Sequence, residues 1–245
     1  MRLAILKRIA RFSRLTYYTT VMYLVTHAIA FTLFPVWSVY TFFSPKGICK
    51  LKQRFGRLLL AIVHKEVKVS GFDNAEEGKH YLIVANYPSF HTGFMLMMLF
   101  PEASIVAHSF MAKVPIINNM LKRNGFIYAH HRGFRRTKQA ISEVIWRSES
   151  SSIIMLPEGK RTHNGRIQEF KRGFLHILRR SSLDLLPVTL NGFYKLKPVN
   201  RLYMNPDTEL EVIIQKPITH STIKALNDEQ LLTATLSSIE GSYKP

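Results

Sequence analysis

The chain of 245 residues has a single cysteine, Cys49, and few acidic residues. One cysteine excludes an internal disulfide framework and any multi-thiolate zinc or iron–sulfur site. Because Cys49 lies in a basic, apolar stretch, we expect it to pack rather than react. Only 16 Asp and Glu stand against 34 Lys and Arg, a formal net charge of +18. Such an excess favours an anionic partner: nucleic acid, a membrane face, or an acidic carrier or phosphate-bearing substrate.

Charge is absent from one long segment, because residues 15–45 contain no Asp, Glu, Lys or Arg. A helix needs about 20 apolar residues to cross a membrane. The segment is long enough, although it contains His27, several threonines and Pro35. It is too long for a signal peptide, and no small-x-small cleavage site follows it.

Basic residues flank this segment on both sides, so the positive-inside rule gives no clear orientation. They are Lys7, Arg8, Arg11 and Arg14 before it, and Lys46, Lys50, Lys52, Arg54 and Arg57 after it. Two arrangements are open: a single span, or a helical hairpin that bends near Pro35 and enters one leaflet. The flanks favour the hairpin, with both ends at the anionic cytoplasmic surface. A buried helix of a soluble protein is the alternative.

Strand and helix patterns alternate through the rest of the chain. Strands are predicted at 65–71, 81–85, 103–108, 125–130, 151–156, 185–192 and 208–218. Helices are predicted at 47–64, 89–100, 114–124, 135–150, 170–181 and 227–240, the last with Asn227 as its N-cap. The alternation predicts an α/β fold with helices on the faces of a sheet. We therefore divide the chain into membrane-anchoring helices at 1–64 and an α/β domain at 65–245.

Two polar loops follow strand ends, at 86–93 and 157–165, where open α/β sheets bind ligands. The second reads "PEGKRTHNG". Its glycine lets a ligand approach the backbone, and its Lys, Arg and Thr offer donors that suit a phosphate monoester. We expect Glu158 to stay ionised among these cations and to orient an arginine or accept from a substrate hydroxyl. A solvated basic turn is the alternative reading.

A third basic loop, "GFIYAHHRGFRR", follows the strand at 125–130, and Arg132 in it is expected to join the anion site. His130 and His131 are adjacent, so on a strand they point to opposite faces. They are therefore a poor metal pair, and we predict no metal site.

Four blocks in order carry a family resemblance: "NYPSFHT" (86–92), "GFIYAHHR" (125–132), "PEGKRT" (157–162) with "FKRG" (170–173), and "LLPVTLNG" (185–192). Together they resemble the glycerolipid acyltransferases typified by 1-acylglycerol-3-phosphate acyltransferase, over roughly residues 65–220. The Pro-Glu-Gly block is highly specific, and the others are strong in combination.

The resemblance implies a central mixed sheet flanked by helices, with a hydrophobic N-terminal helical membrane segment. It implies O-acyl transfer from acyl-CoA or acyl-acyl carrier protein to a glycerol phosphate or lysophospholipid, without cofactor, metal or covalent intermediate. Localisation would be the cytoplasmic face of a membrane, with membrane phospholipids as partners. The phosphate-binding residues implied are Glu158, Gly159, Lys160, Arg161, Thr162, Arg132, Lys171 and Gly173.

The sequence departs from the family in the first block. The family's Asn-His-x-Ser-x-x-Asp keeps its first and fourth residues as Asn86 and Ser89, but Tyr87 replaces the histidine and Thr92 the aspartate. In the family the histidine is the general base and the aspartate orients it. Tyrosine, with a pKa of about 10, is a poor base at neutral pH, and threonine supplies no charge.

Three hypotheses follow for His91, four residues after Tyr87. It replaces the family base from about one helical turn (about 5.4 Å) away, oriented by Glu158 or by no carboxylate. Alternatively, the protein binds a lysophospholipid or acyl donor without turnover. In the third, His91 is an ordinary surface or core histidine, which is compatible with the second.

Nucleic-acid binding is the competing class, because basic residues cluster at 122–138 and 160–180. No recognised nucleic-acid motif accompanies them, and the uncharged segment is hard to reconcile with that class. We therefore predict no nucleic-acid partner, and the oligomeric state stays open.

Overall fold

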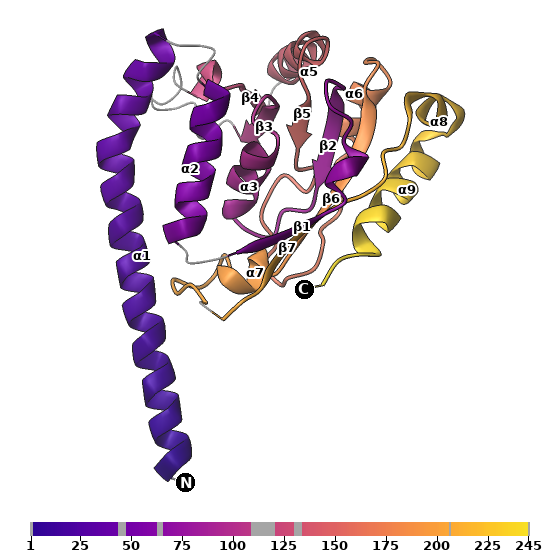
Figure 1. The fold of residues 1–245 in the computed structure, drawn as a ribbon. Coiled ribbons are helices and arrows are strands. Elements are labelled where there is room, and N and C mark those ends of the chain that lie inside the picture. Colours follow the sequence, from indigo (N-terminus) through magenta and orange to yellow (C-terminus); the bar gives the residue numbers. More distant parts are fainter. Residues whose placement is uncertain are drawn as a thin grey trace.

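The computed structural model describes residues 2–43, 48–62, 66–108, 121–129, 134–205 and 207–244. Within these residues the centre is a seven-stranded sheet in the order β1-β7-β6-β2-β5-β3-β4 (Figure 1). The strands are β1 Val67–Ser70, β2 Tyr81–Ala85, β3 Ser104–His108, β4 Phe126–Ala129, β5 Ile153–Met155, β6 Asp184–Asn191 and β7 Leu210–Ile214. Five strands from β6 to β4 run parallel, whereas β7 runs antiparallel to β6 and parallel to β1. The predicted mixed sheet is confirmed.

Helices cover both faces of the sheet (Figure 1). They are α1 Arg2–Phe43, α2 Ile48–Ile62, α3 His91–Leu99, α5 Phe134–Ser148, α6 Gly173–Leu178, α7 Phe193–Leu196, α8 His220–Ala225 and α9 Asp228–Glu240, with the 3-10 turn η2 Phe72–Asn74. One core cluster joins α3 and α7 to the sheet, and a second joins α5, α6, α8 and α9 to the opposite face. The helix predicted at 114–124 lies largely outside the described residues. The short helices α7 and α8 were not predicted.

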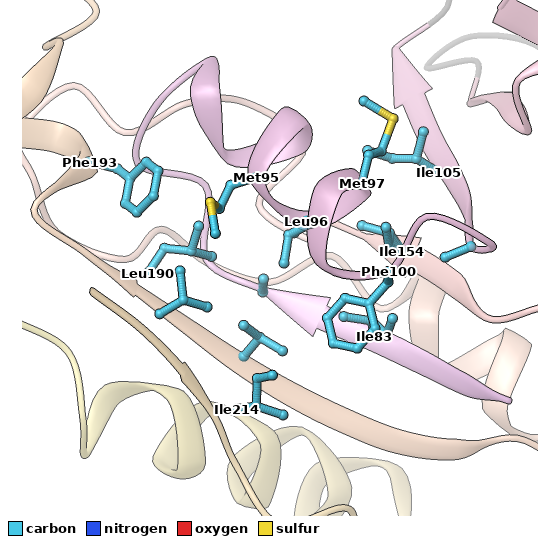
Figure 2. Packing of buried hydrophobic residues seen from close by; sticks show 14 of the residues in the cluster. Ile83, Met95, Leu96, Met97, Phe100, Ile105, Ile154, Leu190, Phe193 and Ile214 are labelled. Carbon is cyan, nitrogen blue, oxygen red and sulfur yellow. The ribbon is translucent and has the colours of Figure 1, made fainter. Parts of the chain in front are cut away.

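Strand β2 explains the two-sided core, because successive side chains of a strand point to opposite faces. Its residues are all buried; Ile83 belongs to the cluster under α3, and Leu82 and Val84 belong to the other. Figure 2 shows Leu96 of α3, and Phe100 directly after that helix, on the same side of the sheet as Ile83. Each such aliphatic side chain contributes about 1.5–3 kcal/mol on burial. A continuous apolar run of this kind is typical of a central parallel strand.

The N-terminal region differs from the prediction in one respect. Helix α1 is continuous through Pro35, so the predicted hairpin bend there is wrong. An interior proline costs a helix about 3 kcal/mol, because it removes a hydrogen bond and its ring crowds the preceding turn, yet α1 stays helical from Arg2 to Phe43. Instead, α2 runs antiparallel beside α1 (Figure 1). Over the residues that the structure describes, no helix is long and apolar enough to cross a membrane.

Helix α2 is fixed to α3 and to the turn after it. A Cβ added to Gly56 would lie 2.5 Å from Cβ of Met98, so the two helices approach closely there. The buried ammonium of Lys52 donates to the carbonyls of Pro101 at 2.9 Å and Ala103 at 3.2 Å. Burial lowers the pKa of Lys52. The N-terminal helices therefore pack on the α/β domain.

Candidate active site

The carboxyl ends of β2, β5 and β6 meet at one edge of the sheet, because the three strands are parallel neighbours. Val84 pairs with Met155 and Pro187, and the next residue, Ala85, pairs with Val188. The two polar loops predicted from the sequence therefore lie together. The backbone N–H of Thr162 in one loop donates to the carbonyl of Tyr87 in the other at 3.1 Å.

Glu158 connects these loops through both carboxylate oxygens. Oε1 accepts from the backbone N–H of Tyr87 at 2.5 Å, and Oε2 accepts from that of Gln168 at 2.8 Å. The side chain is 2% exposed, and burial raises its pKa to about 7 although both hydrogen bonds oppose the shift. Because both oxygens bind backbone amides, Glu158 is a brace between loops. That it also takes part in phosphate binding, or orients an arginine or His91, stays a prediction.

Other polar groups of the 157–173 loop also bind one another. The buried Thr162 hydroxyl donates to Oδ1 of Asn164 at 3.0 Å and accepts from Nε2 of Gln168 at 3.3 Å. Thr162 is therefore a loop-stabilising residue rather than the predicted phosphate donor.

Two glycines of this segment, Gly159 and Gly173, were predicted as phosphate-binding residues. Gly159 has φ of 68°, which favours glycine, and a Cβ there would lie 2.7 Å from Nζ of Lys171. The Lys171 ammonium therefore occupies the space in which a ligand was expected to approach. Gly173 is the first residue of α6.

Two tyrosines from distant parts of the chain hold the same loop. The Tyr194 hydroxyl donates to the carbonyl of His163 at 2.9 Å, and that of Tyr243 donates to the carbonyl of Gly165 at 2.6 Å. Burial, and then the charge of Glu158, raise the pKa of Tyr243 to about 12, so it remains a donor. The loop is thus fixed from outside as well as from within.

The charges of two cations, Lys197 after α7 and Arg161 of this loop, contribute to lowering the pKa of His91. Helix α7, which ends just before Lys197, shares a core cluster with α3, which begins at His91. Among the described residues, the half-buried Arg161 side chain has no hydrogen-bond or ion-pair partner, and the same holds for the exposed Lys160. Arg132 lies outside the described residues.

Lys197 was not predicted as a site residue. It is half-buried at the end of α7, and its ammonium donates to the carbonyl of Pro198 at 3.3 Å and to that of Arg201. Burial and the charge of Arg161 lower its pKa. Its signal in the sequence was a basic residue soon after another parallel strand, at 185–192, whose end was not among the three strand ends predicted to form the site.

His91 begins α3, and its Nδ1 lies 3.1 Å from Oγ of Ser89. That Oγ also accepts from the His91 backbone N–H at 3.3 Å. Burial, and then the charges of Lys197 and Arg161, lower the His91 pKa to about 4, so its imidazole is neutral at pH 7. Ser89, rather than a carboxylate, orients the ring.

The other predicted catalytic residues of the first loop, Tyr87, Thr92 and Asn86, each have a different environment. Burial raises the pKa of Tyr87, against the opposing charge of Arg161, so Tyr87 is a proton donor and not a base at neutral pH. Thr92 is fully buried, and its hydroxyl has no partner within the described residues. The Asn86 amide donates to the carbonyl of Leu190 at 3.0 Å and accepts from its N–H at 2.8 Å. Asn86 therefore anchors the loop to β6, which corrects its prediction as a catalytic residue.

Comparison with known proteins agrees with this geometry. The acyltransferase family profile matches residues 66–191, which is about half of the chain. The chain belongs to the acyltransferase family. The resemblance predicted from the four motifs is thereby confirmed, and the matched acyltransferase region contains the first three blocks and the strand of the fourth.

Relatives of this acyltransferase-family chain carry one name. It is 28% identical over 158 residues to a 1-acyl-sn-glycerol-3-phosphate acyltransferase of Cocos nucifera, covering 62% of the chain and 49% of the relative. It is 26% identical over 135 residues to one of Borreliella burgdorferi, covering 53% and 54%. The chain thus spans about half the length of these curated relatives.

A solved structure shows the same fold. The crystal structure of the 1-acyl-sn-glycerophosphate acyltransferase PlsC from Thermotoga maritima superposes with a TM-score of 0.79 at 20% identity. The match covers 94% of this chain and 95% of that one. Separately, the described part of the chain holds no group of three or more His, Cys, Asp or Glu side chains arranged to hold a metal ion.

Proposed function

We propose that this protein transfers an acyl chain from a thioester, acyl-CoA or acyl-acyl carrier protein, to a hydroxyl of a glycerol phosphate or lysophospholipid. One observation carries the proposal: a neutral histidine, His91, lies beside two cations at the strand edge that holds the family motifs. A neutral imidazole accepts a proton, and the cations provide a site for the acceptor's phosphate. The names of the relatives support the choice of acceptor.

In this proposal Arg161 and Lys197 bind the phosphate. Arg161 supplies a planar pair of donors and Lys197 a point charge, with Lys160, Lys171 and Arg132 as further cations of the loops. Phosphate binding also changes the base. Because the charges of Arg161 and Lys197 lower the His91 pKa, an anion between them raises it. His91 is therefore a stronger base when the acceptor is bound.

The proton moves in a balanced cycle. With Nδ1–H donating to Ser89, Nε2 of His91 accepts the proton of the acceptor hydroxyl as its oxygen attacks the thioester carbonyl. The tetrahedral intermediate collapses, the C–S bond breaks, and the imidazolium returns the proton to the leaving thiolate. Tyr87 is a candidate donor to the oxyanion. The products are an ester and a free thiol, with no covalent enzyme intermediate and no resident cofactor or metal required.

The proposal places the protein on the anionic cytoplasmic face of a membrane, where lysophospholipids reside. Helix α1 contains no acidic residue. Its side chains Leu6, Ile9 and Phe12 are at least 60% exposed, among basic residues that suit anionic lipid. Membrane fractions washed with high salt should retain the protein, and detergent should release it. Complete release by salt would contradict insertion of α1.

A second candidate is an inactive lysophospholipid-binding protein. It is favoured by the fully buried Thr92, which supplies no charge where the family has aspartate, and by a His91 oriented only by a neutral hydroxyl. The cation site would then bind an acceptor that no group activates.

An acylation assay separates the two candidates. Lysophosphatidate and acyl-CoA are offered to the wild type, to His91→Ala and to His176→Ala, a control at an exposed histidine of α6. We expect activity in the wild type and the control, and a loss of about 10²- to 10⁴-fold in His91→Ala, the usual contribution of a general base. Equal activity in all three would rule out His91 as the base. No activity, with lysophosphatidate binding retained, would support the inactive binder.

A further inference from the structure

The loop of residues 197–205 presents an apolar side chain to solvent in an ordered setting. Leu202 is 82% exposed, the largest exposed fraction among the large apolar side chains of the described residues. The loop is closed at its base by the backbone N–H of Asn205, which donates to the carbonyl of Leu196 at 2.8 Å. The Arg201 guanidinium lies 5.4 Å from the centre of the Tyr203 ring. The exposure of Leu202 is therefore a property of a fixed loop.

This loop is attached to the N-terminal helix. The backbone N–H of Met204 donates to the Thr19 hydroxyl at 3.1 Å, and Arg14 forms an ion pair with Asp207. Met204 is buried in the same cluster as Met22 of α1. Figure 1 shows α7 on the side of the molecule along which α1 runs, with the N-terminal half of α1 projecting beyond the α/β domain. The segment that carries Leu202 therefore packs beside the part of α1 from Arg14 to Met22.

Basic residues dominate this surface, and Asp207, the acidic residue just after the loop, is paired with Arg14 of α1. Residues 193–205 contain Lys195, Lys197 and Arg201 and no acidic residue, and α1 contains none either. Apolar side chains that emerge among cations match the interface of an anionic bilayer, where the apolar group enters the acyl boundary and the cations meet headgroups.

We propose that loop 197–205 is a second membrane contact, in which Leu202 enters an anionic phospholipid surface beside α1 and Arg201 meets its headgroups. This inference rests on the proposed function, because it gives the acceptor's route. Lys197 holds the loop through two carbonyls and also acts on His91. Phe193 of α7, the helix just before this loop, packs in one cluster with Met95 of α3, the helix that begins at His91 (Figure 2). In this proposal an acceptor lipid enters the site from the bilayer at the Lys197 end.

Binding to vesicles of phosphatidylcholine with or without phosphatidylglycerol tests the contact on the full chain. We expect Leu202→Glu to require about tenfold more phosphatidylglycerol vesicles for half-maximal binding, the loss of one buried leucine. Trp146→Glu is the matched control, because Trp146 is 67% exposed on α5, which packs against the opposite face of the sheet. Equal binding of Leu202→Glu and the wild type would overturn the proposal.

A labelled variant reports where the loop goes. With Cys49→Ser, an environment-sensitive dye on Leu202→Cys should shift to the blue with phosphatidylglycerol vesicles, and a dye on Trp146→Cys should not. A shift at position 202 that follows protein concentration without vesicles would indicate a second copy as the occupant and would overturn the lipid assignment. No shift in either condition would do the same.

Activity separates this inference from the proposed function. Leu202→Glu should acylate a monomeric short-chain lysophosphatidate like the wild type, and a vesicle-embedded acceptor about tenfold more slowly. If neither protein acylates the monomeric acceptor, the proposed function fails, while the dye still decides the membrane contact. If Leu202→Glu loses both activities equally, the loop serves the site itself and the membrane contact is wrong.

Discussion

Two loops at the same sheet edge contrast in how their polar groups are used. In the 157–173 loop, Glu158 and Thr162 bind backbone or side-chain partners within the protein, and tyrosines hold the loop from outside. In the 86–92 loop, the Thr92 hydroxyl has no partner among the described residues, and His91 binds only the neighbouring Ser89. The 157–173 loop keeps the residues of the family motif. In the 86–92 loop, Tyr87 and Thr92 stand where the family has histidine and aspartate.

The contact between the two loops does not depend on which side chain serves as the base. The brace from Glu158 to the first loop ends on the backbone N–H of Tyr87, which any residue but proline supplies. The side chain at position 87 is therefore free to change without loss of the contact between loops. The contact between the two loops thus depends on backbone groups, whereas the proposed chemistry depends on a few side chains.

The largest expected effect comes from restoring the family pair in the changed loop. In a His91→Ala background, Tyr87→His with Thr92→Asp should regain about 10²- to 10⁴-fold in kcat/KM, because a base oriented by a carboxylate would again face an intact anion site. The control replaces Thr92 with Asn, which supplies no charge. Thermal melting checks that the buried Asp is tolerated, and no gain in a folded variant would show that the scaffold alone is insufficient.

The intact loop is tested through Arg161. Arg161→Ala should lower kcat/KM by about 10²-fold, since a cation paired with phosphate in a partly buried site is removed. Arg161→Lys should recover only part of this, because an ammonium lacks the paired donors. Arg166→Ala, at an exposed arginine of the same loop, should change kcat/KM little. A similar loss in Arg166→Ala would mean that general surface charge, not this site, attracts the acceptor.

Electrostatic contact between the loops predicts a shift in pH dependence. A base with a pKa of about 4 keeps wild-type kcat/KM high well below pH 6.5. Lys197→Gln removes one charge that lowers this pKa, so the acidic limb should move up by roughly one unit. Lys195→Gln, at an exposed neighbour, should leave the limb in place. The acceptor's own ionisation is common to all variants, and an unmoved limb would exclude His91 as the titrating group.

The smallest effect concerns the brace. Because the folded pKa of Glu158, about 7, exceeds its usual 4.5, the group stabilises the fold fully below pH 4.5, and this is lost as pH rises through 7. The free energy of unfolding should therefore fall between pH 5 and 8 by on the order of 3 kcal/mol, and the melting temperature should fall with it. In Glu158→Gln this slope should disappear, with a lower melting temperature at pH 5, since one oxygen cannot accept from two amides. Glu169→Gln, at an exposed site of the loop, should behave like the wild type.

Local patterns in the sequence predicted individual elements well. Strand 81–85 was predicted with its observed bounds, because a continuous apolar run marks a strand that is buried along its whole length. The predicted N-cap at Asn227 was also correct, since its side chain accepts from the backbone N–H of Gln230 in a capping box. Long-range pairing was not predictable in this way. Nothing local indicates that β7 runs antiparallel to β6, or that the brief strand β1 pairs with β7.

In the site, too, local patterns were predictable from the sequence and long-range contacts were not. The two loops were found from their polar residues, but the roles of Glu158 and Asn86 follow from partners on other elements, which a linear sequence does not display. Lys197 was missed because its position depends on the fold of α7 and on the order of strands. Residue type predicted an anion site, which stays a prediction, and only the folded structure showed that Lys197 acts electrostatically on His91.

The edge pair β1–β7 has a consequence for the order of assembly. Val67 of β1 pairs with Leu210, and within the described residues β7 is the only neighbour of β1. Contacts so distant in sequence form late and slow folding. Strand β1 thus waits for one of the last strands to be synthesised, although α2 can already pack on α3 and the turn after it. During translation the backbone groups of β1 stay unpaired until β7 arrives, and a chaperone would protect that exposed edge.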